Sequence, residues 1–248
     1  DDINGDGHVD IFVSGGYIPG SYPKTAPNQL LINDGEGRFT NKIREWAPGL
    51  VQYGEISKSI WVDMNNDTRK DLVVVGEWLP VTVLINSNGK LENKTTDYFK
   101  EEYFGWWNTI ATQDINKDGH PDFIAGNHGK NMQYKASKKE PIELVYADFD
   151  QNGAIDPFLN YYIQGKSYPD VSRNELLQQL SHLASHYTSY ESYSNKTIET
   201  IFTADELKKA KTKTANRLET TLFLSNPKGS YDISPLPLQV QYAPVYAI

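Results

Sequence analysis

Four nine-residue stretches of the chain carry Asp or Asn at the same internal positions, and such side chains can bind a metal ion. Positions 1, 3, 5 and 9 supply carboxylate or amide oxygens, and position 7 can supply its backbone carbonyl. Ca²⁺ takes roughly 6–8 oxygen ligands of these types, so each stretch is predicted to fold around one calcium ion. The predicted metal-binding residues are Asp2, Asn4, Asp6, His8, Asp10, Asp63, Asn65, Asp67, Arg69, Asp71, Asp114, Asn116, Asp118, His120, Asp122, Asp148, Asp150, Asn152, Ala154 and Asp156.

The residues around these stretches argue against an EF-hand. An EF-hand has a Glu at position 12 of the loop and a helix on each side. Here position 12 is Val13, Val74, Ala125 or Leu159, and none of these side chains can bind a metal. An apolar, β-prone segment follows every stretch, and another precedes three of them. The predicted unit is therefore strand, calcium loop, strand.

A second hairpin accompanies several of these units. Predicted strands flank turns rich in Asn, Asp, Ser and Gly at residues 33–37, 86–89 and 225–230. These residue types favour tight connections between strands. Four short strands per unit are typical of a propeller blade. The fold class predicted from the sequence is therefore mainly β, a β-propeller with four-stranded blades and Asp-rich calcium loops.

With these loops and hairpins, the sequence resembles the FG-GAP/VCBS repeat family, the repeats of integrin-α-like propellers and of many bacterial surface proteins. The similarity covers about residues 1–165 and 216–248, and the loop spacing is similar to that of the bacterial group that accompanies an ASPIC/UnbV module. The resemblance implies a calcium-stabilised propeller that binds a ligand, and it brings no catalytic residues. The second loop departs from the pattern, because Thr68 replaces the turn glycine and Lys70 adds a positive charge.

One segment, residues 167–215, is predicted to be helical and to form an insertion within the fourth repeat. Residues 172–175 form a capping box, and further boxes begin at Thr188 and Thr203. The apolar residues after the first box fall on one helical face: Leu176, Leu177, Leu180, Leu183, Ala184 and Tyr187. Such an insertion is either a recognition element or a cap that covers a strand edge or a channel mouth.

The two ends of the sequence favour a partial propeller. The chain opens on Asp1 without the strand that precedes the other loops, and it closes on 243–248, which reads as the strand that enters a loop. The alternative is a last strand that pairs into the first blade and closes a small ring. Residues 1–248 are expected to form one propeller region.

The charge and composition of the chain argue against some classes of function. The formal charge is −8, which four Ca²⁺ ions would offset, and an acidic chain argues against nucleic-acid binding. There is no Cys, and no apolar run approaches the roughly 20 residues of a membrane helix. Calcium loops of moderate affinity suit extracytoplasmic calcium levels, so a secreted, periplasmic or cell-surface location is expected.

The predicted function is non-enzymatic binding of a protein or a glycan. The alternatives are a carbohydrate-active enzyme and a scaffold that only spaces other domains. Aromatic side chains could line a sugar-binding surface, although core packing is the favoured interpretation for them. These aromatic residues are Tyr22, Tyr53, Trp61, Trp78, Tyr103, Trp106 and Trp107. His182 and His186 have the spacing of a helical metal pair, but a plain helix surface is favoured there too.

Overall fold

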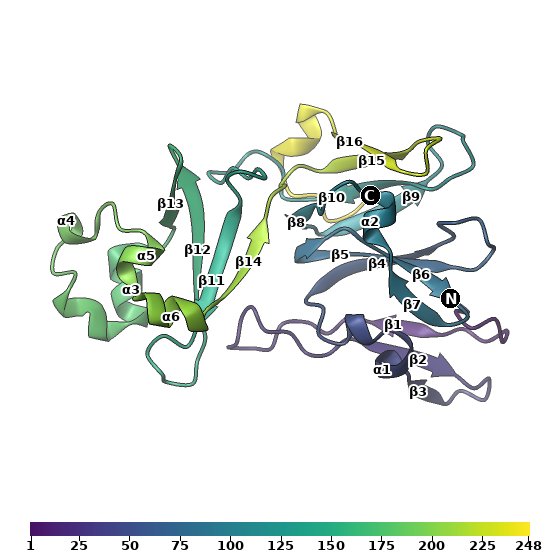
Figure 1. Ribbon diagram of the computed structural model, residues 1–248, viewed down its shortest axis with the longest axis horizontal. Helices are drawn as coiled ribbons and strands as arrows, with labels where there is room; N and C mark the ends of the chain where they lie inside the picture. The colour runs from purple at the N-terminus through teal and green to yellow at the C-terminus, as the bar shows by residue number, and fades with distance from the viewer. The chain divides into compact units, whose positions relative to one another are not determined.

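The computed structural model describes residues 1–248 and is mainly β, as predicted, with four antiparallel sheets (Figure 1). The strands are β1 (Ile11–Val13), β2 (Gln29–Asn33), β3 (Phe39–Asn41), β4 (Ile56–Val62), β5 (Asp71–Pro80), β6 (Thr82–Ser87), β7 (Lys90–Asn93), β8 (Phe104–Trp106), β9 (Thr109–Gln113), β10 (Asp122–Gly126), β11 (Ile142–Ala147), β12 (Asp156–Ile163), β13 (Lys166–Pro169), β14 (Lys211–Ala215), β15 (Thr221–Ser225) and β16 (Tyr231–Pro235). The helices are α1 (Ile43–Trp46), η1 (Pro48–Leu50), α2 (Thr95–Tyr98), α3 (Arg173–Gln179), η2 (Ser181–Ser185), α4 (Tyr190–Tyr193), α5 (Ile198–Ile201), α6 (Ala204–Lys209) and η3 (Leu238–Tyr242).

The chain divides into two compact units. The first comprises Asp1–Tyr17, Thr25–Asn131 and Leu218–Ile248. The second comprises Ile18–Lys24 and Met132–Arg217.

The first unit contains three sheets that follow the predicted blade pattern. Their strand orders are β1-β2-β3, β4-β5-β6-β7 with β8 paired to β5, and β9-β10-β15-β16. In the second and third sheets one strand enters an Asp-rich loop, the next leaves it, and a hairpin completes the sheet. The first sheet has only the strands that follow the loop.

Two apolar cores lie between the sheets of this unit, and β5 contributes to both. Leu72 and Val74 belong to the core shared with β2, α1 and η1, whereas Val73 and Val75 belong to the core shared with β10 and β15. Successive side chains of a strand point to opposite faces, so the continuous run of apolar residues in β5 is explained by burial on both sides. Sheets that pack face to face in this way are propeller-like.

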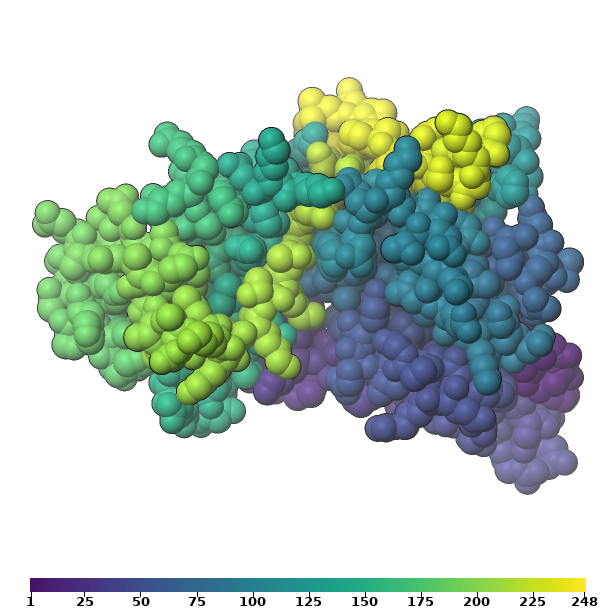
Figure 2. Space-filling model, viewed as in Figure 1, coloured from purple at the N-terminus to yellow at the C-terminus, as the bar shows by residue number.

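The hairpin β15–β16 completes the third sheet, which corrects its assignment to the fourth repeat. Phe223 of β15 pairs with Phe123 of β10 in antiparallel register. In Figure 2 the yellow C-terminal residues lie against the teal residues of the third sheet. The segment Met132–Arg217 is therefore inserted between β10 and β15, which are neighbours in the sheet. A hydrogen bond from Gly129 N to Leu218 O, 2.7 Å long, holds the two ends of the insertion close together.

The C-terminal segment does not close a ring with the first sheet. Val245 N donates to Asn127 O at 3.0 Å, so these residues lie along the end of β10. The alternative of a last strand paired into the first blade is wrong for this structure.

The second unit contains the fourth sheet, of order β13-β12-β11-β14, and the helices α3 to α6. The helical prediction for 167–215 was too long at both ends, because residues 166–169 and 211–215 form β13 and β14. The predicted apolar stripe is buried against Phe149 and Phe158, except for Ala184, which is exposed. The capping boxes at Ser172 and Thr203 are present, whereas the one expected at Thr188 begins one residue later, at Ser189.

Candidate metal loops

The Asp at position 1 of each loop accepts several backbone N–H groups of its own loop. Asp2 Oδ1 accepts from Gly5 N at 2.8 Å, and its Oδ2 accepts from Gly7 N at 2.8 Å. Asp63, Asp114 and Asp148 likewise accept from the residues at positions 5 and 6 of their loops. Desolvation is the largest single influence and raises the pKa of Asp2, but the backbone N–H groups of the loop together outweigh it and lower that pKa. The loop backbone therefore holds this carboxylate in its charged form.

Backbone conformation accounts for the glycine at position 6 of three loops. Position 6 has positive φ in every loop: 87° at Gly7, 84° at Gly119, 88° at Gly153 and 72° at Thr68. Glycine adopts this conformation without steric cost, whereas a β-branched residue such as Thr68 is strained there. The second loop thus keeps the shape of the others despite its missing glycine.

Positions 3 and 5 contact each other in all four loops. The Nδ2 of Asn4, Asn65 and Asn116 donates to the carboxylate at position 5, at 2.7, 3.1 and 3.0 Å. In the fourth loop the roles are exchanged, and Asn152 donates to Asp150 at 2.9 Å. The oxygen-bearing side chains at these positions are thus already side by side.

The Asp at position 9 is buried and ties its loop to another element. In the third loop Asp122 Oδ2 accepts from Ile115 N at 2.7 Å, and its Oδ1 accepts from Ser225 N of β15 at 2.7 Å. Asp10 and Asp71 make the matching pair of bonds, to Asn33 N of β2 and to Asn86 N of β6. These carboxylates therefore join each of the first three loops to the first strand of the hairpin that completes its sheet.

The fourth loop uses a different partner for the same task. Asp156 Oδ2 accepts from Phe149 N at 3.0 Å, but its Oδ1 accepts from the side chain of Gln179 in α3 at 2.9 Å. The Gln179 side chain of the helical segment here takes the place of the backbone N–H that a hairpin strand donates in the other three loops. Asp148, Asp150 and Asp156 each offer an oxygen atom, and these three atoms lie within 4.8 Å of one another, close enough to hold a metal ion.

In the second loop a basic side chain forms an ion pair with a carboxylate of the same loop. Arg69 Nη2 lies 2.7 Å from Asp67 Oδ2, whereas the sequence had directed attention to Lys70. The backbone N–H of Arg69, together with this guanidinium, lowers the pKa of Asp67. Desolvation raises the pKa of Asp71 in the same loop. A metal ion there would have to compete with Arg69 for the position-5 carboxylate.

The position-7 side chains are exposed, as expected for residues whose backbone carbonyl is the predicted ligand. The His8 ring lies over Gly35, where a Cβ would clash with His8 Nε2. His120 Nδ1 lies 3.4 Å from Asn66 Nδ2 of the second loop. Neither imidazole ring forms a hydrogen bond with a carboxylate of its own loop.

Sequence reasoning missed Asn86, which links two loops. Its Nδ2 donates to Ile3 O of the first loop at 2.8 Å and to Lys70 O of the second at 3.0 Å. Asn86 opens a hairpin turn, as Asn33 and Ser225 do in the other sheets, and the buried position-9 Asp bonds to all three. That shared place in the repeat is the signal that could have identified it.

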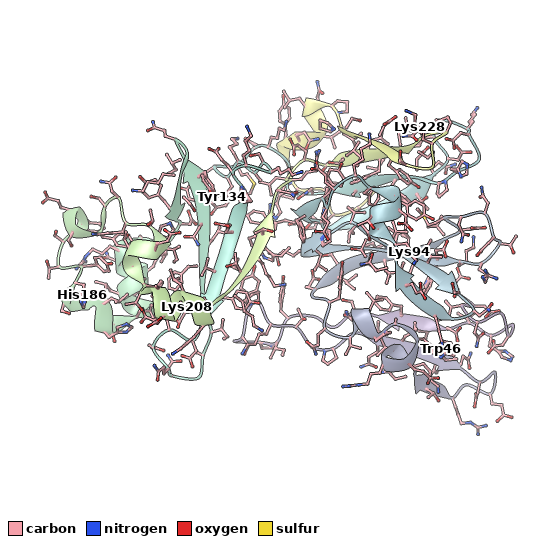
Figure 3. All side chains as sticks on the ribbon, viewed as in Figure 1. Trp46, Lys94, Tyr134, His186, Lys208 and Lys228 are labelled. Atoms are coloured by element: carbon pink, nitrogen blue, oxygen red, sulfur yellow. The ribbon has the colours of Figure 1, made fainter.

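The other sequence candidates fall outside the loops. Trp78, Tyr103, Trp106 and Trp107 are buried, so core packing is the better interpretation for them. His182 and His186 are exposed, and η2 ends at Ser185, so no α-helix places them on one face. Figure 3 shows His186 at the margin of the helical segment.

Residues 2–74 and 63–125 each match the FG-GAP-like repeat family. The chain belongs to this family. The matched residues include the first three loops with their strands, and repeats of this family are typical of propeller-like binding domains and often bind calcium. No curated protein matches the chain significantly. None of its helices has the length and apolar character that crossing a membrane requires.

Proposed function

We propose that this chain is a calcium-stabilised, non-enzymatic binding domain that works outside the cytoplasm, secreted, periplasmic or on the cell surface, and recognises a protein or a glycan. The observation that carries the proposal is the repeated loop. Four times, oxygen-bearing side chains gather in a loop that leads into a strand, with the first carboxylate held by backbone N–H groups.

The donor set suits calcium among the common biological cations. Carboxylate, amide and carbonyl oxygens without His or Cys ligands favour a hard ion, and a flexible loop of this size fits Ca²⁺ better than the octahedral Mg²⁺. In each loop positions 1, 3, 5 and 9 would hold the ion, with position 7 contributing its carbonyl. A bound ion would neutralise converging carboxylates and so stabilise the end of each sheet.

A binding role is favoured over catalysis because the conspicuous carboxylates are already used within the loops. The position-9 carboxylates are buried and accept backbone N–H groups, and the Asp67 carboxylate is paired with Arg69. An acid–base pair would need carboxylates free to reach a substrate.

Thermal unfolding in calcium tests the metal part of the proposal. Ca²⁺ at 100 times its Kd should stabilise the chain by about 2.7 kcal/mol per site, whereas EDTA or equimolar Mg²⁺ should not. Asp148→Asn should reduce the effect, and Asp232→Asn, an exposed Asp of β16, is the matched control. An unfolding curve that is identical in Ca²⁺ and in EDTA would refute the proposal.

A further inference from the structure

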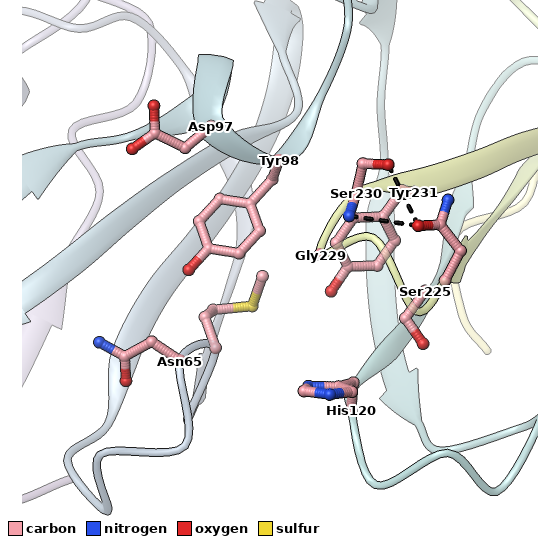
Figure 4. A pocket seen from close by; sticks show the side chains of 10 residues that line it. Asn65, Asp97, Tyr98, His120, Ser225, Gly229, Ser230 and Tyr231 are labelled. Atoms are coloured by element: carbon pink, nitrogen blue, oxygen red, sulfur yellow. Dashed lines mark hydrogen bonds between the residues drawn. The ribbon is translucent and has the colours of Figure 1, made fainter.

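A groove opens in the first unit between the second and third Asp-rich loops. It has a volume of about 330 Å³ and is bounded by Asn65, α2, His120 and the β15–β16 hairpin. Figure 4 shows Tyr98 and Asn65 on one side of it and His120, Ser225 and Tyr231 on the other. This volume is at the small end of the range for ligand pockets, which suits a single ring-sized group.

The floor of the groove is apolar and includes two tyrosines. Tyr231 is fixed, because its ring packs 5.3 Å from the Phe99 ring and its hydroxyl donates to Pro121 O at 2.7 Å. Tyr98 lies 6.4 Å from Tyr231 between ring centroids and is partly exposed. Met64 completes this floor. An aromatic face beside a methionine offers contact to C–H groups.

Unused hydrogen-bonding groups surround the apolar floor. The Tyr98 hydroxyl makes no hydrogen bond within the protein. Asn226 uses its Oδ1 to accept from Ser230 N and Oγ, which leaves its Nδ2 without a protein partner. Ser230 Oγ donates in that bond and can still accept another. The groove therefore offers both donors and acceptors around an apolar surface.

We propose that this groove binds one neutral sugar ring of a glycan, with a C–H face of the ring on Tyr98 and its hydroxyls on the surrounding polar groups. The inference rests on the proposed binding function and specifies its ligand class. A pyranose combines an apolar face with a polar edge, which matches this arrangement.

The charges around the groove argue against an anionic sugar. Asp97, which is not a loop residue, lines the groove, and its carboxylate would repel a sialic or uronic acid whether or not the loops hold calcium. His120 is the only residue lining the groove that can become a cation.

A basic peptide is also less suited to the groove than a sugar. Asp67 is already paired with Arg69, and Asp118 accepts from Asn116 Nδ2 at 3.0 Å. Asp97 is the one carboxylate that lines the groove, so a basic peptide would find a single ion-pair partner there. A neutral polyol requires no ion pair there.

The test uses the full 248-residue chain on a glycan array carrying neutral and acidic glycans, followed by calorimetric titration of the best neutral sugar. Tyr98→Ala should weaken binding about tenfold by removing the stacking surface. Tyr98→Phe should weaken it by a few fold, because only the hydroxyl is lost. Tyr246→Ala, a tyrosine 68% exposed in the same unit, is the matched control and should bind as the parent does.

The outcomes separate this inference from the proposed function. Neutral glycan binding that depends on Tyr98 supports the groove. Binding that survives Tyr98→Ala with an unchanged melting temperature overturns it, as does an array on which a calcium-stabilised protein binds no neutral glycan. A basic peptide that binds in a Tyr98-dependent way overturns the sugar assignment. In each of these negative cases the calcium response still tests the proposed function separately.

Discussion

Replacing Asp122 by Asn should destabilise the first unit even when no calcium is present. Asp122 is fully buried, and its Oδ2 accepts from Ile115 N at 2.7 Å and from Asn116 N at 3.3 Å. Its Oδ1 accepts from Ser225 N at 2.7 Å and from Ser225 Oγ at 2.8 Å. All four donors belong to the protein, so this carboxylate joins the third loop to β15 without any metal.

The expected loss of stability follows from the hydrogen bonds that an Asn side chain cannot accept. Asn keeps one oxygen and turns an NH₂ group toward the other pair of donors, so at least one buried N–H loses its acceptor. A buried donor without a partner costs about 1–3 kcal/mol, and with two donors on each oxygen we expect about 2–4 kcal/mol. For a domain of this size that corresponds to a fall of roughly 4–16 °C in melting temperature.

Tryptophan fluorescence is a suitable assay, because all five Trp residues lie in the first unit. Unfolding should be followed in EDTA and in calcium for Asp122→Asn, Asp118→Ala and the control Asp232→Asn. Asp118 is exposed, so Asp118→Ala should change little in EDTA but should diminish the gain in stability from calcium. His120→Ala should keep that gain, since its predicted ligand is the backbone carbonyl. An Asp122→Asn protein as stable as the parent in EDTA would refute the reasoning.

Three further predictions concern other parts of the chain. Arg69→Ala should tighten calcium binding at the second loop, because it frees the Asp67 carboxylate. Arg38→Ala, which removes an exposed cation of the first unit, is the control. Unchanged stoichiometry and affinity in calorimetric titration of Arg69→Ala with calcium would contradict this prediction. Replacing residues 173–209 by a Gly/Ser linker, which keeps β13 and β14, should expose Phe149 and Phe158 and cause loss of the second unit's fold or aggregation; a soluble protein of unchanged stability would instead favour a dispensable recognition element. Hydrogen bonds from the Thr203 side chain and backbone lower the pKa of Glu206, so the charged form stabilises α6. That contribution is complete above the ordinary pKa of 4.5 and is lost as pH falls through the lower pKa of the folded state. Helical circular dichroism should therefore decline on acidification, and less steeply in Glu206→Gln.

Local patterns allowed much of the fold to be predicted. The strands on either side of the loops, the hairpins and two capping boxes depend on short-range chemistry: β-branched runs, turn residues and N-cap side chains. The burial of Leu176, Leu180 and Leu183 followed from helical periodicity alone.

Those local patterns could not predict which strands pair when they are far apart in the sequence. Nothing in residues 221–235 distinguishes pairing with β10 from pairing with β12, because both strands present apolar side chains at the right period. The structural bonds of Asp122 were also hidden, since the Ser225 backbone N–H that it binds is distant in sequence. Lys70 was singled out for its charge, but Arg69 has the length and planar geometry to reach Asp67.

The nested position of the second unit has a consequence for biosynthesis. On the ribosome β10 emerges before Met132–Arg217, and its partner β15 emerges only afterwards. At translation speeds of about 5–20 residues per second, the interval is on the order of ten seconds. During this time one edge of β10 is unpaired and Phe123 lacks its contact with Tyr231, while the inserted unit can already fold. The yield of recombinant protein should therefore depend on the rate of translation and on chaperones that bind the unpaired edge of β10.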